Sequence, residues 1–454
     1  MDIIVELRLA LGPSSVFTDN AIGLSCHSDA SRTGTTRPLA LLRPRTVEAI
    51  SAAMAICHRY GASVVPQGGM TGLAGGANPR SSDIVLSLEL LNQIEEIDSE
   101  ASTITLQAGC VLQHAQEAVA AVGLLLPIDL GSRGSCQIGG IISTNAGGLR
   151  VIRYGMTRDN LLGLEVVLAD GTILSNLGKM VKNNTGYDLR HLFCGSEGTL
   201  GVITRAVLRL RPLPSARNTA LVALPNYQSV IALLSGARRH LQELSAFEVM
   251  WGSYLSFSQK CEGIELFAVP PPFSVILEVE ASHAPNSDFT EFLADALEDG
   301  ILENAFIAQS DREAQNFWSV REGHAMDAAL PDLINLDVSM QLGHIGSFAE
   351  ACADALGVRF PTAHVSFYGH IGDSNLHVAI AGYKGGEASS SIIEEIVYGL
   401  VRDFKGSISA EHGIGTLKRP YLGHSRSAAE IATMRTIKMA LDPKQIMNPG
   451  KVLP

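Results

Sequence analysis

Pro66-Gln-Gly-Gly-Met-Thr-Gly-Leu-Ala-Gly-Gly76 follows directly after a short β-branched run, Ser63-Val-Val65. Glycine is kept where φ must be positive or where a ligand must approach the backbone closely. A ligand with a pyrophosphate needs rows of backbone N–H groups with no side chains in the way, and turns of this kind supply them. A run of tight turns in a glycine-rich protein is the alternative explanation, and for Ala74–Gly76 it is equally good. The stretch predicts a strand that opens into a phosphate-binding turn.

Two further glycine-rich segments follow, from Pro127 to Gly148 and from Asn184 to Thr204. None of the three segments contains the dinucleotide fingerprint G-x-G-x-x-G or the P-loop pattern G-x-x-x-x-G-K-[ST]. A nicotinamide-dependent Rossmann enzyme and a P-loop nucleotidase are therefore disfavoured. The three segments together predict a large dinucleotide that several loops bind at once.

Short strands and helices alternate around these segments, which is typical of a mixed α/β architecture. Apolar residues at helical spacing predict a helix over 46–60, and an apolar run on either side of Asp170-Gly171 predicts a hairpin. A closing strand is expected over 207–210 and a linker over 211–215. Beyond Pro214 glycine thins out, and helices alternate with strands. We expect three parts: residues 1–214, residues 215–400 and a C-terminal segment, 401–454, with a helix over 428–440.

The composition is that of an ordinary globular protein, with 46% hydrophobic and 18% charged residues in 454. A net charge of −12 without any Lys/Arg run argues against nucleic-acid binding. The first residues lack the basic and apolar regions of a signal peptide, and no apolar run approaches the ~20 residues of a membrane span. Seven scattered cysteines without a Cys-x-x-Cys pair predict a reducing compartment. We expect a cytoplasmic location.

A second informative stretch is Tyr368-Gly-His370-Ile-Gly-Asp-Ser-Asn-Leu-His377, followed by Glu411-His412-Gly-Ile-Gly. Three nitrogen or oxygen ligands with an open fourth position form the ligand set of a catalytic divalent metal site, with zinc the favoured ion. Such an ion can lower the pKa of a substrate alcohol, and a histidine that is not a ligand can then take the proton. A single histidine in a glycine-rich turn more often bonds only to backbone. Four such groups in two motifs favour the metal site.

Together these motifs resemble those of the vanillyl-alcohol-oxidase (PCMH) type of FAD-binding proteins. Pro66–Leu73 resembles the pyrophosphate loop of that family, and the second and third glycine-rich segments look like its flavin-binding continuation. The match is closest to the D-2-hydroxyacid dehydrogenase branch, which includes D-2-hydroxyglutarate dehydrogenase, D-lactate dehydrogenase and the flavin subunit of glycolate oxidase. The motifs around His370 and Glu411, with Asn448-Pro-Gly-Lys, resemble the C-terminal motifs of that branch.

The resemblance implies an α+β fold. A two-part FAD-binding domain would be followed by a substrate (cap) domain of antiparallel sheet and helices, and the C-terminal helical segment would return to the FAD-binding domain. It also implies that FAD is held without a covalent bond, because relatives with covalent flavin carry a histidine near the position of Met70. The implied FAD-binding residues are Pro66, Gln67, Gly68, Gly69, Met70, Thr71, Gly72, Leu73, Gly76, Asp129, Leu130, Gly134, Ser135, Gly139, Gly140, Ser143, Thr144, Asn145, Gly147, Gly148, Glu197, Gly198, Gly201, Val202 or Ile203, and Asn448.

The resemblance assigns roles to the remaining polar residues as well. The implied metal ligands are His370, His377 and Glu411, for zinc or else manganese, iron or cobalt. His412 would be the catalytic base, and Arg321 would hold the substrate carboxylate, since a guanidinium makes bidentate hydrogen bonds to a carboxylate. The alternative for Arg321 is a surface ion pair with Glu322 or a neighbour. Further expected roles are substrate binding for Asn335, substrate binding or support of the glycine-rich turn for Asn375, and orientation of a ligand histidine for Asp373.

The implied reaction is oxidation of a D-2-hydroxy acid to the 2-oxo acid, with hydride passing to flavin N5. The electrons would leave for a separate acceptor, such as electron-transfer flavoprotein or a quinone, and we expect a homodimer. Two alternatives stay open: an oxidase that passes electrons to oxygen, and a flavin subunit of a multi-subunit glycolate or lactate oxidase complex.

Four positions depart from the pattern of relatives that use 2-hydroxyglutarate: Ala325, Asn335, Ala379 and Ser374. Those relatives carry threonine, lysine, asparagine and glycine there, respectively. The first three departures remove polar contacts and one positive charge. A substrate with a neutral or apolar tail is therefore as plausible as 2-hydroxyglutarate.

Overall fold

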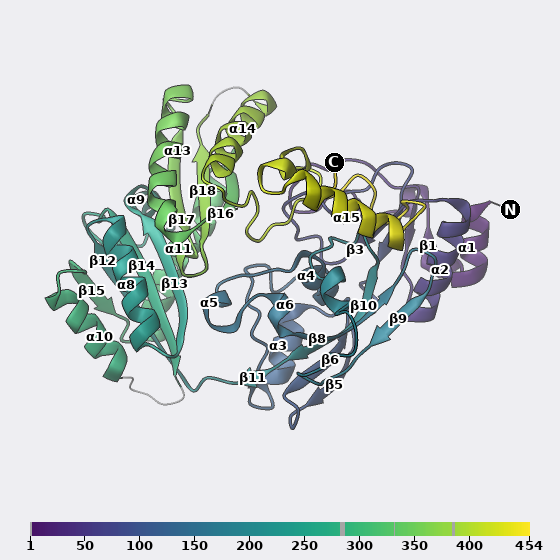
Figure 1. Cartoon of the computed structure of the whole chain (residues 1–454), viewed down its shortest axis with the longest axis horizontal. Helices are drawn as coiled ribbons and strands as arrows, with labels where there is room; N and C mark the ends of the chain where they lie inside the picture. The colour runs from purple at the N-terminus through teal and green to yellow at the C-terminus, as the bar shows by residue number, and fades with distance from the viewer. Residues whose placement is uncertain (1, 282–286, 331, 384–385) are drawn as a thin grey trace. The chain divides into compact units, whose positions relative to one another are not determined.

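The computed structural model describes residues 2–281, 287–330, 332–383 and 386–454. The chain forms two compact units (Figure 1). Unit 1 comprises Met1–Gly148, Tyr154–Leu213 and Glu411–Pro454, and unit 2 comprises Leu149–Arg153 and Pro214–Ala410. The expected C-terminal segment began at residue 401, whereas unit 2 extends to Ala410. Among the residues described, no helix combines the length and the apolar character needed to cross a membrane.

The first sheet of unit 1 carries the Pro66 loop. Helix α2 (Val47–Tyr60) begins where the Thr46 side chain accepts a hydrogen bond from the Ala49 N–H, and it ends at Gly61 with a φ of 65°. The chain then enters β3, which ends at Gln67, so the glycine-rich loop starts at the end of a parallel strand. The strand order is β1 (Val16–Phe17), β2 (Ala40–Leu42), β4 (Ile84–Ser87), β3 (Val64–Gln67), and helix α1 (Ile3–Leu11) packs on α2.

The second sheet of unit 1 is antiparallel and five-stranded. Its order is β5 (Ile94–Asp98), β6 (Thr103–Gln107), β10 (Val202–Arg209), β8 (Leu161–Val167), β9 (Ile173–Asn176). The predicted hairpin is present as β8 and β9. Two expectations are wrong in detail. The closing strand starts at Val202, and the supposed linker contains β11 (Arg211–Pro212), which pairs with β7 (Leu124–Leu125).

Helices complete unit 1 and close its C-terminal segment onto the first sheet. They are α3 (Leu112–Ala120), α4 (Ile138–Thr144), α6 (Thr157–Asn160), α7 (Arg190–Phe193) and α15 (Ala428–Leu441), while α5 (Val151–Tyr154) spans the passage from unit 2 back to unit 1. After α15, the Asn448 N–H donates to the Val64 carbonyl, and Met447 lies beside Val64 as a parallel bridge. The end of the chain thereby reaches the strand that leads into the Pro66 loop.

Unit 2 is built on one seven-stranded antiparallel sheet, in agreement with the predicted substrate domain of antiparallel sheet and helices. The strand order is β15 (Asn304–Ile307), β12 (Ala216–Leu224), β14 (Phe273–Ala281), β13 (Leu244–Trp251), β17 (His364–Gly369), β18 (Asn375–Ala381), β16 (Ile334–Ser339). The helices are α8 (Tyr227–His240), α9 (Gly252–Glu262), α10 (Ser287–Glu298), α11 (Asp311–Glu322), α12 (His324–Ala329), α13 (Ile345–Arg359) and α14 (Glu387–Asp403).

One face of this sheet carries both apolar and polar functional residues. Side chains two residues apart along a strand share a face. Met250, Tyr368 and Ala379 pack with helices α9 and α11 in one apolar cluster. Glu248 lies two residues from Met250, and His377 lies two residues from Ala379. Both polar residues therefore point to the same face as the cluster.

Candidate functional site

The three glycine-rich segments of unit 1 contribute to one wall of a cavity of about 680 Å³. This volume lies within the usual range for small-molecule and cofactor sites. Glu411 and His412, from the C-terminal segment of the same unit, also line it. Of the residues implied to bind FAD, those that line the cavity are Pro66, Gln67, Gly68, Gly69, Met70, Thr71, Gly72, Leu73, Gly76, Leu130, Ser135, Gly139, Gly140, Ser143, Thr144, Gly147, Glu197, Gly198, Gly201, Ile203 and Asn448.

Five residues implied to bind the cofactor do not line this cavity: Asp129, Gly134, Asn145, Gly148 and Val202. Val202 precedes Ile203 on β10, and the alternation of a strand turns it to the other face. Asn145 ends α4 with a φ of 49°, and its carboxamide oxygen accepts a hydrogen bond from the Arg158 N–H. Gly148 acts through its N–H, which donates to Glu411 Oε1 at 2.9 Å.

The wall of the cavity is shaped for backbone contact with a ligand. A β-carbon at Gly69 would lie 2.0 Å from the Ser135 carbonyl oxygen, so the first glycine-rich segment touches the second with no room for a side chain. Met70 has a φ of 57°, which holds the loop in a turn that few residues other than glycine adopt. The residues present therefore fit a pyrophosphate held by backbone N–H groups.

Two polar side chains of the wall support the same fit. Gln137 is 9% exposed, and its Oε1 has no hydrogen-bond partner among the described residues. The Oδ1 of Asn448 is also buried without a partner in the part of the chain that the structure describes, while its Nδ2 donates to the carbonyls of Gly76 and Glu197. Buried acceptors without partners are costly unless a ligand or water satisfies them. Gln137 was missed from the sequence, although it lies between Ser135 and Gly139.

Glu411 and His412 occupy a loop that is bonded to the first and the third glycine-rich segments of unit 1. The Thr416 N–H donates to the Ala74 carbonyl at 2.9 Å, after the loop has passed Glu197. Burial raises the pKa of Glu197, against the opposing effect of backbone N–H groups and Lys418. An imidazole is thereby placed on the wall of the cavity in unit 1.

In unit 2, a row of residues crosses four neighbouring strands. Met250 on β13 is opposite Tyr368 on β17, which is opposite His377 on β18, which is opposite Asp337 on β16. The Tyr368 and His377 rings lie 4.8 Å apart between centroids. The register of the sheet thus brings together residues that lie far apart in the sequence.

A buried charged cluster lies beside this row. The Glu248 carboxylate is 2.6 Å from Arg321 Nη2 and 2.7 Å from His370 Nδ1. Arg321 also stacks over the Tyr368 ring, with its guanidinium carbon 4.7 Å from the centroid. Burial by itself raises the pKa of Glu248, but the charges of His370 and Arg321, with their hydrogen bonds, lower it to about 2. The carboxylate is therefore ionised and holds both partners.

This cluster corrects the alternative interpretation of Arg321. Arg321 is not in a surface ion pair with Glu322, because its guanidinium is buried and paired with Glu248. His370 is oriented by Glu248. The carboxylate of Asp373 accepts a hydrogen bond from the Asn375 N–H, and its role in orienting a ligand histidine stays a prediction. Glu248 was missed because it is the one charged residue within the largely apolar strand β13.

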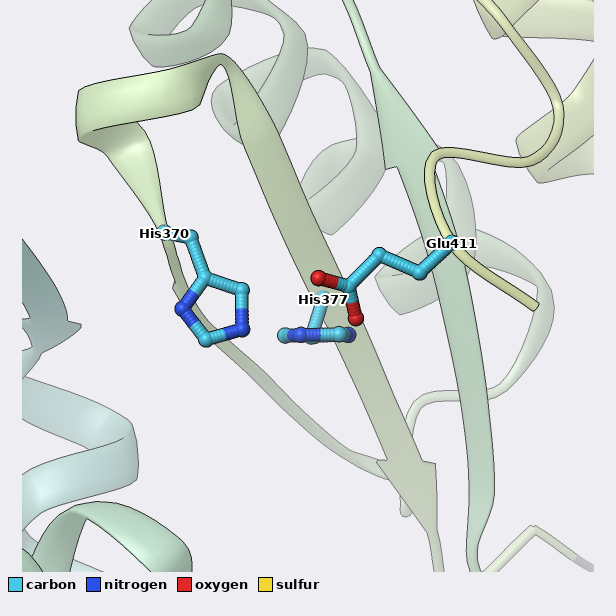
Figure 2. A group of neighbouring side chains, drawn as sticks. All are labelled: His370, His377 and Glu411. Carbon is cyan, nitrogen blue, oxygen red and sulfur yellow. The ribbon is translucent and has the colours of Figure 1, made fainter. Parts of the chain in front are cut away.

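Figure 2 shows His370 after β17 and His377 on β18, and it labels Glu411, the first residue of the C-terminal segment of unit 1. The ring centroids of His370 and His377 lie 5.5 Å apart, and the two ring planes are nearly perpendicular, at 81°. Because the Glu248 carboxylate accepts from His370 Nδ1, the neutral form of that imidazole carries its lone pair on Nε2. On β16, Asp337 is opposite His377, and its Oδ2 accepts from the Ala410 N–H at 3.0 Å.

The implied substrate-binding residues lie on the same sheet. The Asn335 amide donates to the Tyr368 hydroxyl at 2.6 Å. Asn375 is 3% exposed, and neither side-chain polar atom has a partner among the residues described. Ala379 packs in the apolar cluster. Ser374, where relatives carry glycine, has a φ of 75°, which explains why glycine suits that position.

Two family models match most of the chain. Residues 213–452 match the family described as FAD linked oxidases, C-terminal domain. Residues 38–176 match the family described as FAD binding domain.

The chain is similar in sequence to several dehydrogenases over most of its length. It is 38% identical over 449 residues to a mitochondrial D-2-hydroxyglutarate dehydrogenase of Bos taurus, covering 97% of this chain and 82% of that protein. It is 38% identical to a D-2-hydroxyglutarate dehydrogenase of Xanthomonas citri pv. viticola, covering 93% and 91%. A putative mitochondrial D-lactate dehydrogenase of Schizosaccharomyces pombe is 39% identical, with 90% and 81% covered.

Solved structures with the same fold are more distant in sequence. An alkyldihydroxyacetonephosphate synthase superimposes with a TM-score of 0.77 at 18% identity, covering 98% of this chain and 85% of that one. A p-cresol methylhydroxylase superimposes with a TM-score of 0.76 at 15% identity, covering 99% and 96%. Such identities speak for the fold alone, and they confirm the predicted vanillyl-alcohol-oxidase (PCMH) fold class.

Proposed function

Because the chain belongs to the FAD-linked oxidase family, together with its D-2-hydroxyglutarate dehydrogenase relatives, we propose that it oxidises a D-2-hydroxy acid to the 2-oxo acid. The family predicted from the sequence motifs is confirmed, and the protein is an FAD-dependent oxidoreductase. The observation that carries the proposed reaction is the shared cavity of unit 1, where His412 faces the glycine-rich loops.

FAD fits the cavity through the groups that line it. The Pro66–Gly76 loop offers backbone N–H groups to the pyrophosphate. The buried side-chain oxygens of Gln137 and Asn448 can accept hydrogen bonds from the cofactor. When bound, FAD supplies the hydride acceptor for the Cα hydrogen of the substrate. Met70 has no nucleophilic ring nitrogen, so we propose that these contacts hold FAD without a covalent bond.

His412 is the proposed base. Its imidazole lies on the cavity wall and can accept the proton of the substrate hydroxyl as the Cα–H bond breaks. The loop around it has no room for larger residues, since a β-carbon at Gly413 would lie 2.9 Å from Glu197 Oε1 and one at Gly415 would lie 2.0 Å from the Ala74 carbonyl oxygen. Placement is the demanding part, because hydride transfer needs reacting atoms within about 3–3.5 Å.

We further propose that His370, His377 and Glu411 hold a divalent ion, with zinc favoured by two imidazoles and one carboxylate. In unit 2, the hydrogen bond to Glu248 fixes the tautomer of His370, and Asp337, opposite His377, holds the Ala410 N–H. Glu411 follows Ala410 directly, so its Cα is about 3.8 Å from that anchored residue. When bound, the ion supplies Lewis acidity that lowers the pKa of a substrate hydroxyl.

Arg321 is the proposed partner of the substrate carboxylate. Glu248 accepts from its Nε at 2.8 Å and from its Nη2 at 2.6 Å, which uses two of the five N–H donors of a guanidinium. The remaining donors are held in one plane by that pair and by the Tyr368 ring. Asn375, whose buried amide has no partner among the described residues, is a second proposed contact, and Asn335 is a third.

We propose that a substrate with a neutral or apolar tail fits the enzyme as well as 2-hydroxyglutarate does. Ala325 and Ala379 offer no polar side-chain atom, and Asn335 places no positive charge where relatives carry lysine. Each lost hydrogen bond to a charged group removes about 1.5–3 kcal/mol of binding. D-lactate and similar acids are therefore as well suited as D-2-hydroxyglutarate, and both substrates stand in the names of relatives.

Three further features belong to the proposal. The electrons leave for a separate acceptor such as electron-transfer flavoprotein or a quinone, and the enzyme acts as a homodimer in the cytoplasm. The second candidate is a flavin subunit of a larger glycolate or lactate oxidase complex. Purification of the flavoprotein from its own cells distinguishes the homodimer from the complex, because a complex would co-purify further chains with the flavoprotein.

The test is anaerobic reduction of the purified flavoprotein. D-lactate and D-2-hydroxyglutarate should bleach the flavin absorbance, whereas the L-enantiomers should not. A chelator should suppress bleaching, and zinc should restore it. His412→Ala should keep the flavin but lose reduction by at least a hundredfold, within the usual range for a general base. His114→Ala, an exposed histidine on α3, is the matched control. Reduction of His412→Ala at the parental rate would exclude His412 as the base.

A further inference from the structure

Glu197 has an unusual position within unit 1. It lies in the third glycine-rich segment and lines the cavity, with a φ of 51°, a conformation that non-glycine residues adopt only at a cost. Its own N–H donates to the Ser143 carbonyl at 2.8 Å, and its carbonyl accepts from Asn448 Nδ2 at 2.8 Å. Its backbone is thus fixed on both sides. Strain of this kind persists where the surroundings determine the conformation, and it often marks a functional position.

The carboxylate of Glu197 points at the loop that carries His412. Its Oε1 accepts from the Ile414 N–H at 2.7 Å, and its Oε2 accepts from the Gly415 N–H at 2.8 Å. These two residues lie 217 and 218 positions away in the sequence. A carboxylate that takes two successive N–H groups holds the peptide between them in one orientation.

The loop is built to receive that carboxylate. A β-carbon at Gly413 would lie 2.9 Å from Glu197 Oε1, and one at Gly415 would lie 2.0 Å from the Ala74 carbonyl oxygen. On the other side of His412, the Glu411 carboxylate accepts from the Gly148 N–H. His412 therefore lies between two anchors, and the anchor on its C-terminal side is Glu197.

We propose that Glu197 is a positioning residue for His412, acting through the backbone N–H groups of Ile414 and Gly415. This inference rests on the proposed role of His412 as the base. The sequence resemblance implied that Glu197 binds the cofactor, which stays a prediction, and its carboxylate in addition accepts hydrogen bonds from the loop of His412. The competing explanation is that Glu197 only fastens the C-terminal segment to the rest of unit 1.

Glu197→Gln separates the two explanations with almost no change in volume. The amide oxygen of the new glutamine can still accept a hydrogen bond from one of the two N–H groups. Its amide nitrogen faces the other N–H group and cannot accept a hydrogen bond from it. In the FAD-loaded enzyme, we expect the rate constant of anaerobic flavin reduction by D-lactate to fall about 10- to 100-fold, since a small misplacement of a reacting group has effects of this size. The pH dependence of that rate constant should also shift, because the base is displaced.

A second readout does not depend on activity. Hydrogen exchange of the peptide covering residues 411–416 should accelerate about tenfold or more in Glu197→Gln, because loss of a charged hydrogen bond exposes its N–H partner. Glu100→Gln, an exposed glutamate of unit 1, should change neither readout. Gly413→Ala, which pushes a methyl group against the same carboxylate, should reproduce the effects of Glu197→Gln if the latter variant folds poorly.

Two results would overturn the inference. One is a Glu197→Gln enzyme with parental reduction rate and parental exchange of residues 411–416. The other is a lower melting temperature or FAD content while the FAD-loaded fraction still reduces at the parental rate and pH profile, which assigns Glu197 to fastening alone. Failure of the proposed function looks different, because His412→Ala would then reduce at the parental rate whatever Glu197→Gln does.

Discussion

Replacing Arg321 with methionine removes the cation from a carboxylate that has no access to water. The side chains of Arg321 and Glu248 are 5% and 1% exposed, and their charged atoms lie 2.6 Å apart. Breaking a buried ion pair by removing one partner costs about 3–5 kcal/mol, because the other charge stays buried. Since His370 Nδ1 still bonds Glu248, we expect the lower end of that range.

The loss translates into a measurable melting shift. In a unit of 150–250 residues, 1 kcal/mol corresponds to about 2–4 °C, so about 3 kcal/mol lowers the melting temperature of unit 2 by about 6–12 °C. The assay is thermal unfolding followed by tryptophan fluorescence, without substrate. Both tryptophans of the chain, Trp251 on β13 and Trp318 on α11, lie in unit 2, so the signal reports that unit.

The matched control is Arg402→Met in the same unit. Arg402 and Asp403 form an ion pair at 3.0 Å, but their side chains are 56% and 59% exposed. Exposed pairs contribute about 0–1 kcal/mol, so this variant should melt within about 4 °C of the parent. If Arg321→Met melts as close to the parent as Arg402→Met does, the buried pair does not stabilise unit 2 and the reasoning is refuted.

Three further predictions concern unit 1, the thiols and the flavin. Burial raises the pKa of Glu165, but the hydrogen bonds and charge of Arg205 outweigh it and leave the pKa lowered. The stability from this pair is therefore present above the ordinary pKa of 4.5 and is lost as the pH falls through the lowered pKa. In circular-dichroism melts, lowering the pH below 4.5 should therefore reduce the melting temperature of Arg205→Met less than that of the parent. Burial raises the pKa of Cys57 and of Cys352 to about 12 each, so in native protein at neutral pH these thiols should resist a disulfide reagent that titrates all seven cysteines in detergent. Acid precipitation should release all the flavin into the supernatant, and colour retained in the pellet would contradict non-covalent binding.

Much of the cavity could be predicted from the sequence, because its wall is made by local turns. Each glycine-rich segment is contiguous, so the Pro66 loop needed no information from elsewhere in the chain. Gln137 was missed because nothing in a local pattern says which way a side chain at the start of a helix points. The sequence did not show which of Val202 and Ile203 faces the cavity, since the face to which each side chain of a strand points depends on its neighbours in the sheet.

The charged cluster of unit 2 could not be predicted from the sequence, for a related reason. Glu248 contacts His370, which is 122 residues away, and Arg321, which is 73 residues away. These contacts follow from the pairing of β13 with β17, where Met250 is opposite Tyr368. A shift of that register by one residue would turn Glu248 to the other face of the sheet. No spacing along the chain encodes this register.

The sequence by itself determined the family and the fold class, through the resemblance of its motifs to those of known proteins. It also determined the loops that make the cavity of unit 1, because turn chemistry is a local property. Only the tertiary structure decided which carboxylate holds which partner: Glu248 for Arg321 and His370, and Glu197 for the loop of His412. The physical reason is that a buried charge is stabilised only by groups that folding brings within hydrogen-bonding distance, and those groups lie far apart in the sequence.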